Sequence, residues 1–149
     1  FLAYSARHVV KDCFRRMIID TSAFIELFAS GSSATRIAEA LTKSNDLKVS
    51  SVSVLETAAL IRRQHGRAGV DQFLEFIIQH KIQIIPFDGD QLLAALLGEA
   101  AYGEGTDSGT HVGSNLRLAE LCTYGLAKSG NEPVLHTNKN LRRTDLEDA

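Results

Sequence analysis

The sequence predicts an α/β domain of three layers, with a mainly parallel central sheet flanked by helices. Short β-rich segments alternate with segments of helical periodicity along the chain, which is typical of this fold class. With 149 residues, of which 44% are hydrophobic, the chain has the length and composition of one domain with a single core. It contains no internal repeat and no low-complexity tract, which excludes a repeat architecture.

Four short β-rich segments predict the strands of the sheet. Each is apolar and is bounded by polar or turn-forming residues. We expect them to run parallel, because a helical segment separates each strand from the next and can serve as a crossover. They cover residues 17–20, 47–51, 82–86 and 133–136.

Helical periodicity fills the segments between these strands. Thr21 or Ser22 is placed to cap the first helix, and Asp88 or Asp90 is placed to cap the helix of the third crossover. Gly66 is expected to end one helix before the next begins. The helices cover about 21–30, 34–41, 53–65, 70–77, 92–97 and 115–128, and the glycine-rich residues 103–114 form a long loop.

Met17, the only methionine, directly precedes the first strand. Residues 1–16 are basic and lack the uninterrupted apolar stretch of a secretory signal. Two interpretations stay open for them: an ordered N-terminal extension, or non-native upstream sequence joined to a protein that begins at Met17. We expect the domain itself to occupy residues 17–149.

The overall charge and the cysteine content exclude several classes of protein. Sixteen Lys and Arg against eighteen Asp and Glu give a net charge of −2, so a strongly basic nucleic-acid coat is excluded. No apolar run approaches the roughly 20 residues of a membrane-spanning helix. Two cysteines, Cys13 and Cys122, are too few for a disulfide scaffold. A cytoplasmic location is the simplest expectation.

Two acidic residues are expected at the same edge of the sheet. Asp20 ends the first strand, and Glu56 lies near the start of the helix that follows the second strand. Ligands of parallel sheets bind beyond the carboxyl ends of the strands. Glu56 has an alternative interpretation, a capping box with Ser53 that complements the helix dipole. Burial of Asp20 is unfavourable unless a cap, a cation or a metal ion pairs with it.

Paired carboxylates at this edge suit Mg²⁺ or Mn²⁺, which prefer hard oxygen ligands. Such an ion would lower the pKa of a bound water and stabilise charge on a phosphodiester. The sequence lacks the motifs of other common sites: GxxxxGK[ST], GxGxxG after a strand, GxSxG and HExxH. Its five histidines are scattered, and none has the spacing of a metal-binding pair.

Three stretches together resemble a PIN domain and, more narrowly, the VapC-type ribonuclease toxins: MIIDTSAFIEL (17–27), SSVSVLETA (50–58) and CTYGLAKSGNEPVL (122–135). The similarity covers roughly residues 17–146. It implies a metal-dependent endoribonuclease with Mg²⁺ or Mn²⁺ as cofactor, the toxin of a type II toxin–antitoxin pair. It also implies RNA as substrate, a small cognate antitoxin that blocks the site, and a homodimer.

The resemblance extends to particular acidic residues. Asp20 and Glu56 match the first two acids of the family, and Glu120 stands four positions before Tyr124, where the family has the Asp of a G-D-C motif. The resemblance therefore implies that Asp20, Glu56 and Glu120 are catalytic and bind the metal. Asp145, in a matching T-D pair, is a weaker metal candidate. For Glu120 the alternative is a solvated residue on the surface of its helix.

Other positions depart from the family pattern. Asn138 and Asn140 stand where a fourth acid is common, and residues 104–121 match poorly around a longer loop. Two alternative functions therefore stay open: a catalytically weak or inactive PIN-fold binding module, and a structure-specific DNA nuclease on the same site.

Five arginines are candidates for RNA binding: Arg62, Arg63, Arg67, Arg142 and Arg143. From the same resemblance we expect partly exposed apolar surface on the first two helices, at Phe24, Phe28 and Ile37.

Overall fold

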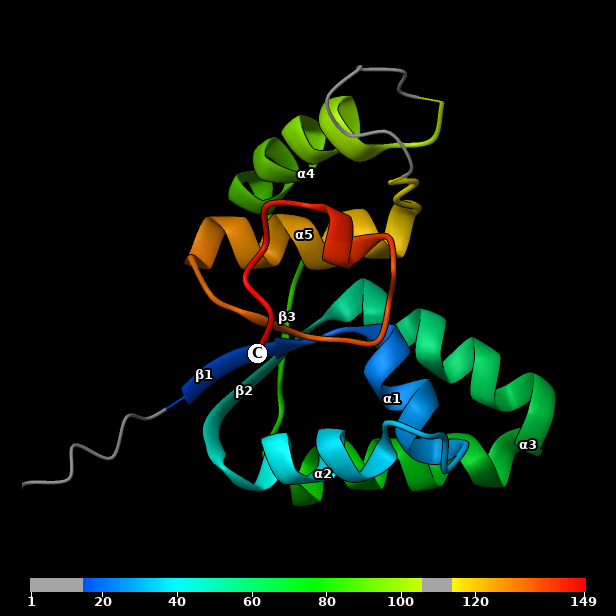
Figure 1. Ribbon diagram of the computed structural model, residues 1–149. Helices are drawn as coiled ribbons and strands as arrows, with labels where there is room; N and C mark the ends of the chain where they lie inside the picture. Colours follow the sequence, from blue (N-terminus) through cyan, green and yellow to red (C-terminus); the bar gives the residue numbers. More distant parts are fainter. Residues whose placement is uncertain (1–14, 106–113) are drawn as a thin grey trace, which may run out of the picture.

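The computed structural model describes residues 15–105 and 114–149. Within them a sheet of four parallel strands has the order β3-β2-β1-β4 (Figure 1). The strands are β1 (Arg15–Ile19), β2 (Ser44–Ser50), β3 (Gln83–Ile85) and β4 (Val134–Leu135). The predicted α/β class and the parallel sheet are confirmed. Residues 1–14, most of the expected N-terminal extension, lie outside the described residues, as does 106–113 of the expected loop.

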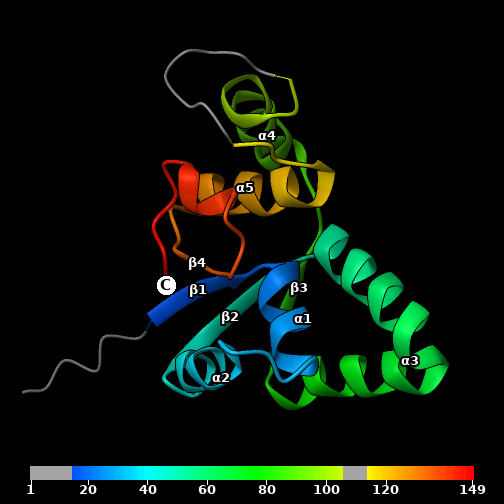
Figure 2. The same cartoon turned by 45° about the vertical axis from the view of Figure 1, so that its right-hand side comes forward.

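The helices occupy both sides of the sheet. α1, α2 and α3 cover one face and α5 covers the other, with α4 packed on the outside of α5 (Figures 1 and 2). They are α1 (Thr21–Phe28), α2 (Ala34–Thr42), α3 (Ser51–Gln79), α4 (Gly89–Tyr102) and α5 (Leu118–Gly130), with a short 3-10 turn η1 (Leu141–Arg143). In this described part of the chain, no helix is long and apolar enough to cross a membrane.

The register of the sheet brings the ends of the central strands together. Met17 of β1 pairs with Leu47 of β2, and Ile19 pairs with Leu135 of β4, all in parallel. The chain leaves β1 at Asp20 and enters α1 at once, and it leaves β2 at Ser50 and enters α3 at once. Parallel pairing thus places the starts of α1 and α3 at one edge, as the sequence predicts.

Some helix boundaries differ from those predicted. Asp20, rather than Thr21 or Ser22, caps α1, because its carboxylate accepts a hydrogen bond from the backbone N–H of Ser22. The expected break at Gly66 is confirmed, because α3 consists of two helices that meet there at a kink, where Gly66 has a non-helical φ of 64°. A positive φ is energetically unfavourable for a residue with a Cβ, which explains why glycine occupies this position.

The core lies on both faces of β1. On the side of α1, α2 and α3, Phe24 packs edge-to-face against Phe73, with ring centroids 5.2 Å apart. Phe24 and Ile37 are each 1% exposed and Phe28 is partly buried, so the expectation of exposed apolar surface is wrong for Phe24 and Ile37. Phe24 and Ile37 are therefore core residues that are not free to contact a partner, whereas Phe28 is partly exposed, as expected.

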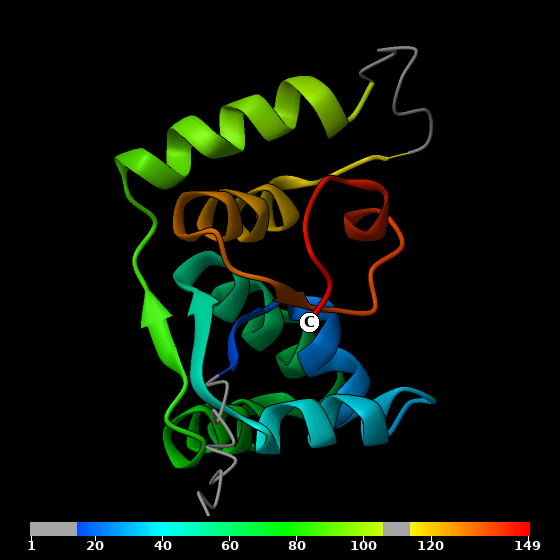
Figure 3. The same ribbon diagram turned by 60° about the vertical axis from the view of Figure 1, so that its left-hand side comes forward.

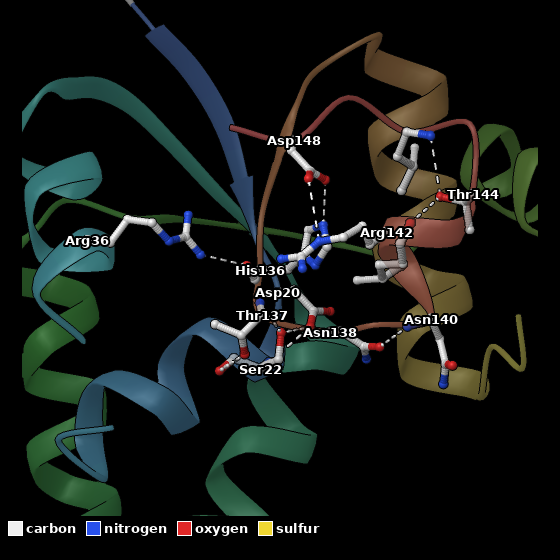
Figure 4. Close-up of polar contacts among 12 residues, drawn as sticks. Asp20, Ser22, Arg36, His136, Thr137, Asn138, Asn140, Arg142, Thr144 and Asp148 are labelled. Atoms are coloured by element: carbon white, nitrogen blue, oxygen red, sulfur yellow. Dashed lines mark hydrogen bonds and ion pairs between the residues drawn. The ribbon is translucent and has the colours of Figure 1, made fainter. Parts of the chain in front are cut away.

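The C-terminal residues extend the sheet beyond β4. Asp148 pairs with Val134 in an isolated parallel bridge, and the N–H of Ala149 donates to the carbonyl of Val134. The buried imidazole Nε2 of His136 lies 2.7 Å from a carboxylate oxygen of Asp148, and the guanidinium of Arg36 donates to the carbonyl of His136 (Figure 4). These contacts fasten the segment that follows β4, which also borders the site described next.

Candidate functional site

A cavity of about 270 Å³ opens at the carboxyl edge of the sheet, between the starts of α1, α3 and α5. Three of the sequence-predicted acids, Asp20, Glu56 and Glu120, line it together. They come from positions up to 100 residues apart in the chain. The remaining lining residues are Thr21, Ser22, Ile25, Glu26, Leu60, Thr137 and Asn138.

Asp20 is buried, with 1% of its surface exposed, and both of its carboxylate oxygens accept hydrogen bonds. Oδ2 accepts from the backbone N–H and the hydroxyl of Ser22, at 2.9 and 2.7 Å. Oδ1 accepts from the hydroxyl of Thr123 at 2.9 Å. The cap of α1 and the Thr123 hydroxyl therefore offset much of the cost of burying this carboxylate. They also fix its orientation toward the cavity.

The segment after β4 closes the site on one side. The backbone N–H of Thr137 donates to the hydroxyl of Ser22, which in turn donates to Asp20. Figure 4 shows Asp20, Ser22, Thr137 and Asn138 gathered where β1 and β4 end. Since the N–H of Asp20 donates to the carbonyl of Leu135, the two strand ends are also tied by their backbones.

Glu56 projects from α3 and is partly exposed. The N-cap of α3 is Ser50, whose hydroxyl accepts from the N–H of Val52, so the interpretation of Glu56 as part of a capping box with Ser53 is wrong. The hydroxyl of Ser53 instead bonds that of Thr123. Within the described residues, no hydrogen bond or ion pair occupies the Glu56 carboxylate. Burial, together with the negative charge of Glu56, raises the pKa of the Cys122 thiol.

Glu120 lies in the first turn of α5 and serves a structural role there. Its Oε2 accepts from the backbone N–H of Arg117 at 2.7 Å, which forms one half of a capping box. Its Oε1 accepts from the amide of Asn138. Glu120 thus reaches the cavity, but both of its oxygens already have partners from the protein.

Asp145 does not line this cavity. Its carboxylate accepts hydrogen bonds from the hydroxyl of Tyr124 and from the ammonium of Lys128, each at 2.8 Å. Partial burial opposes ionisation of Asp145, but these two hydrogen bonds outweigh it and lower the pKa of its carboxyl below the ordinary value of 3.8. The structure therefore separates Asp145 from the other three acids and gives it a partner at the C-terminal end of α5.

The Asp145 contacts predict a pH-dependent contribution to stability. Because the folded-state pKa is lowered, this contribution is present above the ordinary pKa of 3.8 and is lost as the pH falls through the folded value. The pair is half exposed, so we expect Asp145→Asn to cost less than about 1 kcal/mol at pH 7. Urea unfolding between pH 7 and 3 should show that the difference in free energy of unfolding between the Asp145→Asn variant and the parent becomes smaller at the acid end. If that difference in stability were as large at pH 3 as at pH 7, the lowered pKa of Asp145 would be contradicted.

Two residues that the sequence reasoning did not assign to the site contribute to it. Thr123 is fully buried and donates to Asp20. Asn138, noted only as a replacement for an acid, donates to Glu120 and lines the cavity. Thr123 lies three residues after Glu120, one turn along α5, and this spacing is the signal that could have identified it.

The arginines proposed to bind RNA lie outside the cavity that the acids line. Arg62 and Arg63 line a separate cavity of about 540 Å³, whose other lining residues are Leu55, Ala58, Ala59 and Val70. Arg142 makes an ion pair with Asp148, with 3.9 Å between nitrogen and oxygen. None of these arginines lines the acidic cavity.

Residues 17–147 match the model of the PIN domain. The chain belongs to the PIN domain family. Ribonuclease VapC30 of Mycobacterium tuberculosis is 27% identical over 130 residues, which cover 87% of this chain and 95% of that protein. The predicted resemblance to the PIN family and to VapC ribonucleases is thereby confirmed.

Solved structures of this family have the same fold. M. tuberculosis VapC20, described as a toxin that cleaves the sarcin-ricin loop, superposes with a TM-score of 0.70 at 10% identity, over 89% of this chain and 98% of VapC20. VapBC2 of Rickettsia felis, solved bound to a DNA fragment from its promoter, gives a TM-score of 0.67 at 15% identity, over 89% of this chain and 95% of the matched chain. At these identities the likeness concerns the fold.

Proposed function

We propose that this PIN domain is a metal-dependent endoribonuclease, the toxin of a type II toxin–antitoxin pair. The observation that carries the proposal is the cavity that Asp20, Glu56 and Glu120 line together at the carboxyl edge of the sheet. A cavity lined by several carboxylates attracts cations, and nucleases use such acids to bind divalent ions. The similarity to proteins named VapC ribonucleases supports RNA as the substrate.

The groups around the cavity fit Mg²⁺ or Mn²⁺ in chemical type. Their side chains offer carboxylate, hydroxyl and amide oxygens, the hard ligands that these ions prefer. Across residues 15–105 and 114–149, no three His, Cys, Asp or Glu side chains are close enough together to bind one ion jointly. We therefore propose that one or two of the carboxylates hold the ion and that water completes its coordination, as is usual for Mg²⁺.

The three acids then have different parts in the site. Asp20 is the fixed carboxylate, because Ser22 and Thr123 orient both of its oxygens. Glu56 is the carboxylate whose oxygens are available, since none of the described residues occupies them. Glu120 links the start of α5 to Asn138 and presents charge to the cavity. When bound, the ion would acidify water and stabilise negative charge on the phosphodiester.

Glu120 provides a specific test, because its helix-capping role and its proposed part in the site can be separated. Glu120→Gln removes the charge and turns an amide N–H₂ toward one of its present donors, so we expect RNA cleavage to fall at least about tenfold. Glu120→Asp keeps the charge at the chain length that the family uses, so it should retain more activity than the Gln variant. Cleavage of a structured RNA with Mg²⁺ or Mn²⁺ measures both. Equal cleavage by the parent and the Gln variant would limit Glu120 to capping α5.

We also propose a small antitoxin partner and a homodimer. Solved relatives of similar fold include toxin–antitoxin complexes, among them VapBC of Salmonella typhimurium bound to DNA, with a TM-score of 0.65. Co-purification with the product of an adjacent short reading frame, and inhibition of cleavage by that product, test the antitoxin. A monomeric chain across the micromolar range would count against the homodimer.

One observation favours a second function, a binding module without nuclease activity. Asp20 and Glu120 each have both oxygens hydrogen-bonded by the protein, and Asn138 stands where the family often has an acid. If the protein is such a binding module, the unmodified chain would bind RNA or a protein partner. It would show neither RNA cleavage nor stabilisation by Mg²⁺ and Mn²⁺.

A further inference from the structure

Two consecutive residues after β4 hold two of the acids of the site. The backbone N–H of Thr137 donates to the hydroxyl of Ser22 at 3.1 Å, and that hydroxyl donates to Asp20 at 2.7 Å. The side-chain amide of Asn138 donates to Glu120. The orientation of both carboxylates therefore depends on where the backbone of these two residues lies.

His136, the residue before them, is anchored away from the cavity. Its side chain is 1% exposed, and its Nε2 lies 2.7 Å from a carboxylate oxygen of Asp148 (Figure 4). Its carbonyl oxygen accepts a hydrogen bond from the guanidinium of Arg36 on α2, at 3.0 Å. His136 is therefore held through its side chain and its backbone by segments 12 and 100 residues away in the chain.

The contact between His136 and Asp148 is a hydrogen bond that the imidazole donates. An ionised carboxylate only accepts hydrogen bonds, so Nε2 carries the hydrogen. The other ring nitrogen, Nδ1, is buried and has no hydrogen-bond partner among the described residues. A buried N–H without an acceptor is unfavourable, so the place of this ring depends on Asp148.

The C-terminal residues bring Asp148 to this position. They return to β4 and end beside it (Figure 3), with the N–H of Val134 donating to the carbonyl of Glu147 and the N–H of Ala149 donating to the carbonyl of Val134. The side chain of Asp148 is itself 54% exposed. Replacing Asp148 therefore removes the hydrogen bond to the imidazole without opening a cavity in the core.

We propose that His136, with Asp148 as its partner, is a positioning residue of the nuclease site. The anchored imidazole fixes the start of the segment whose next two residues hold the acids. Neither His136 nor Asp148 lines the cavity, so both act through that segment. Loss of a group that orients metal ligands commonly costs 10–100-fold in activity or metal affinity. The inference rests on the proposed function and adds a supporting contact to its site.

Amide hydrogen exchange followed by NMR tests the anchoring without RNA or metal. Asp148→Ala removes the acceptor of the imidazole, so the Thr137 amide should exchange at least about tenfold faster than in the parent. The amide of Ile82, beside β3 at the opposite edge of the sheet, is the reference and should keep its rate. An unchanged rate at Thr137 overturns the proposal. Equal acceleration at Thr137 and Ile82 also does so, because it indicates general destabilisation.

Two further variants separate the hydrogen bond from the charge of the C-terminal residues. Asp148→Asn weakens the exposed ion pair with Arg142 but keeps an acceptor oxygen, so Thr137 should exchange as in the parent. Glu147→Ala removes a neighbouring charge whose side chain makes no hydrogen bond or ion pair with the described residues, and it should also match the parent. If Asp148→Asn exchanges as fast as Asp148→Ala, the hydrogen bond is not the anchor and the proposal fails.

Cleavage of a structured RNA with Mg²⁺ or Mn²⁺ measures the consequence for the site. Asp148→Ala should lower kcat at least about tenfold and leave KM within about twofold, because the change affects the orientation of the acids and not a contact with RNA. Asp148→Asn should restore most of the lost kcat. Faster exchange at Thr137 with an unchanged kcat overturns the positioning role alone. If the parent cleaves no RNA, the nuclease proposal fails, while the exchange rates still decide whether His136 anchors the segment.

Discussion

Replacing Asp20 by Asn should reduce RNA cleavage at least about 100-fold, because changes even to groups that only support metal ligands cost 10–100-fold. Asp20 is the most rigidly held of the three acids, with Ser22 and Thr123 donating to its two oxygens. An Asn in its place loses the negative charge and turns an N–H₂ group toward one of these donors. The site then lacks its fixed carboxylate.

The same variant should lose its stabilisation by metal. A ligand that binds only the folded state adds about 2.7 kcal/mol at a hundredfold excess over its dissociation constant. We expect Mg²⁺ or Mn²⁺ to raise the Tm of the parent but not that of the Asp20→Asn variant. This measurement needs no RNA, so it detects a metal site even if the RNA offered is not the natural substrate.

Asp88→Asn is the matched control. Asp88 caps α4 as Asp20 caps α1, its carboxylate accepting from the N–H of Gln91 at 2.9 Å, but it does not line the acidic cavity. Asn is as good a helix cap as Asp, so this variant should keep both cleavage and the response to metal. If Asp20→Asn behaves like Asp88→Asn, Asp20 is a helix cap and not a metal ligand.

Phe24→Ala should lower the free energy of unfolding by about 3–5 kcal/mol, the usual cost of truncating a buried Phe. The ring of Phe24 contacts those of Phe73 and Phe76 edge-to-face, at 5.2 and 6.4 Å between centroids. Its removal leaves a cavity between α1 and α3, the two helices whose starts carry the acidic site. For a domain of this size we expect Tm to fall on the order of 10 °C.

This result would distinguish a core residue from a docking residue. Had Phe24 been partly exposed for a partner, as the family resemblance led us to expect, its truncation would leave the isolated chain about as stable as before. Leu55→Ala serves as the control, because Leu55 is 71% exposed and its truncation should change stability by no more than about 0.5 kcal/mol. A small effect of Phe24→Ala in thermal or urea unfolding would contradict the packing described above.

The sequence by itself determined the parts of the fold that depend on local pattern. β-rich segments alternating with helical ones predicted a parallel sheet, and parallel strands deliver Asp20 and the start of the Glu56 helix to one edge whatever the details of packing. The position of Gly66 likewise predicted the interruption of α3, because a left-handed φ is a local property.

The tertiary structure alone decided which side chains meet and which side of each helix is buried. Glu120 has its Asn138 partner, and Asp145 its Tyr124 partner, through contacts between segments 18 and 21 residues apart, and no local periodicity encodes such distances. The leucines of α4 are a second example of what local periodicity does not encode. Periodicity predicts an apolar helix, but close packing through Gly98 and Gly125 buries the side with small residues and leaves the leucines exposed.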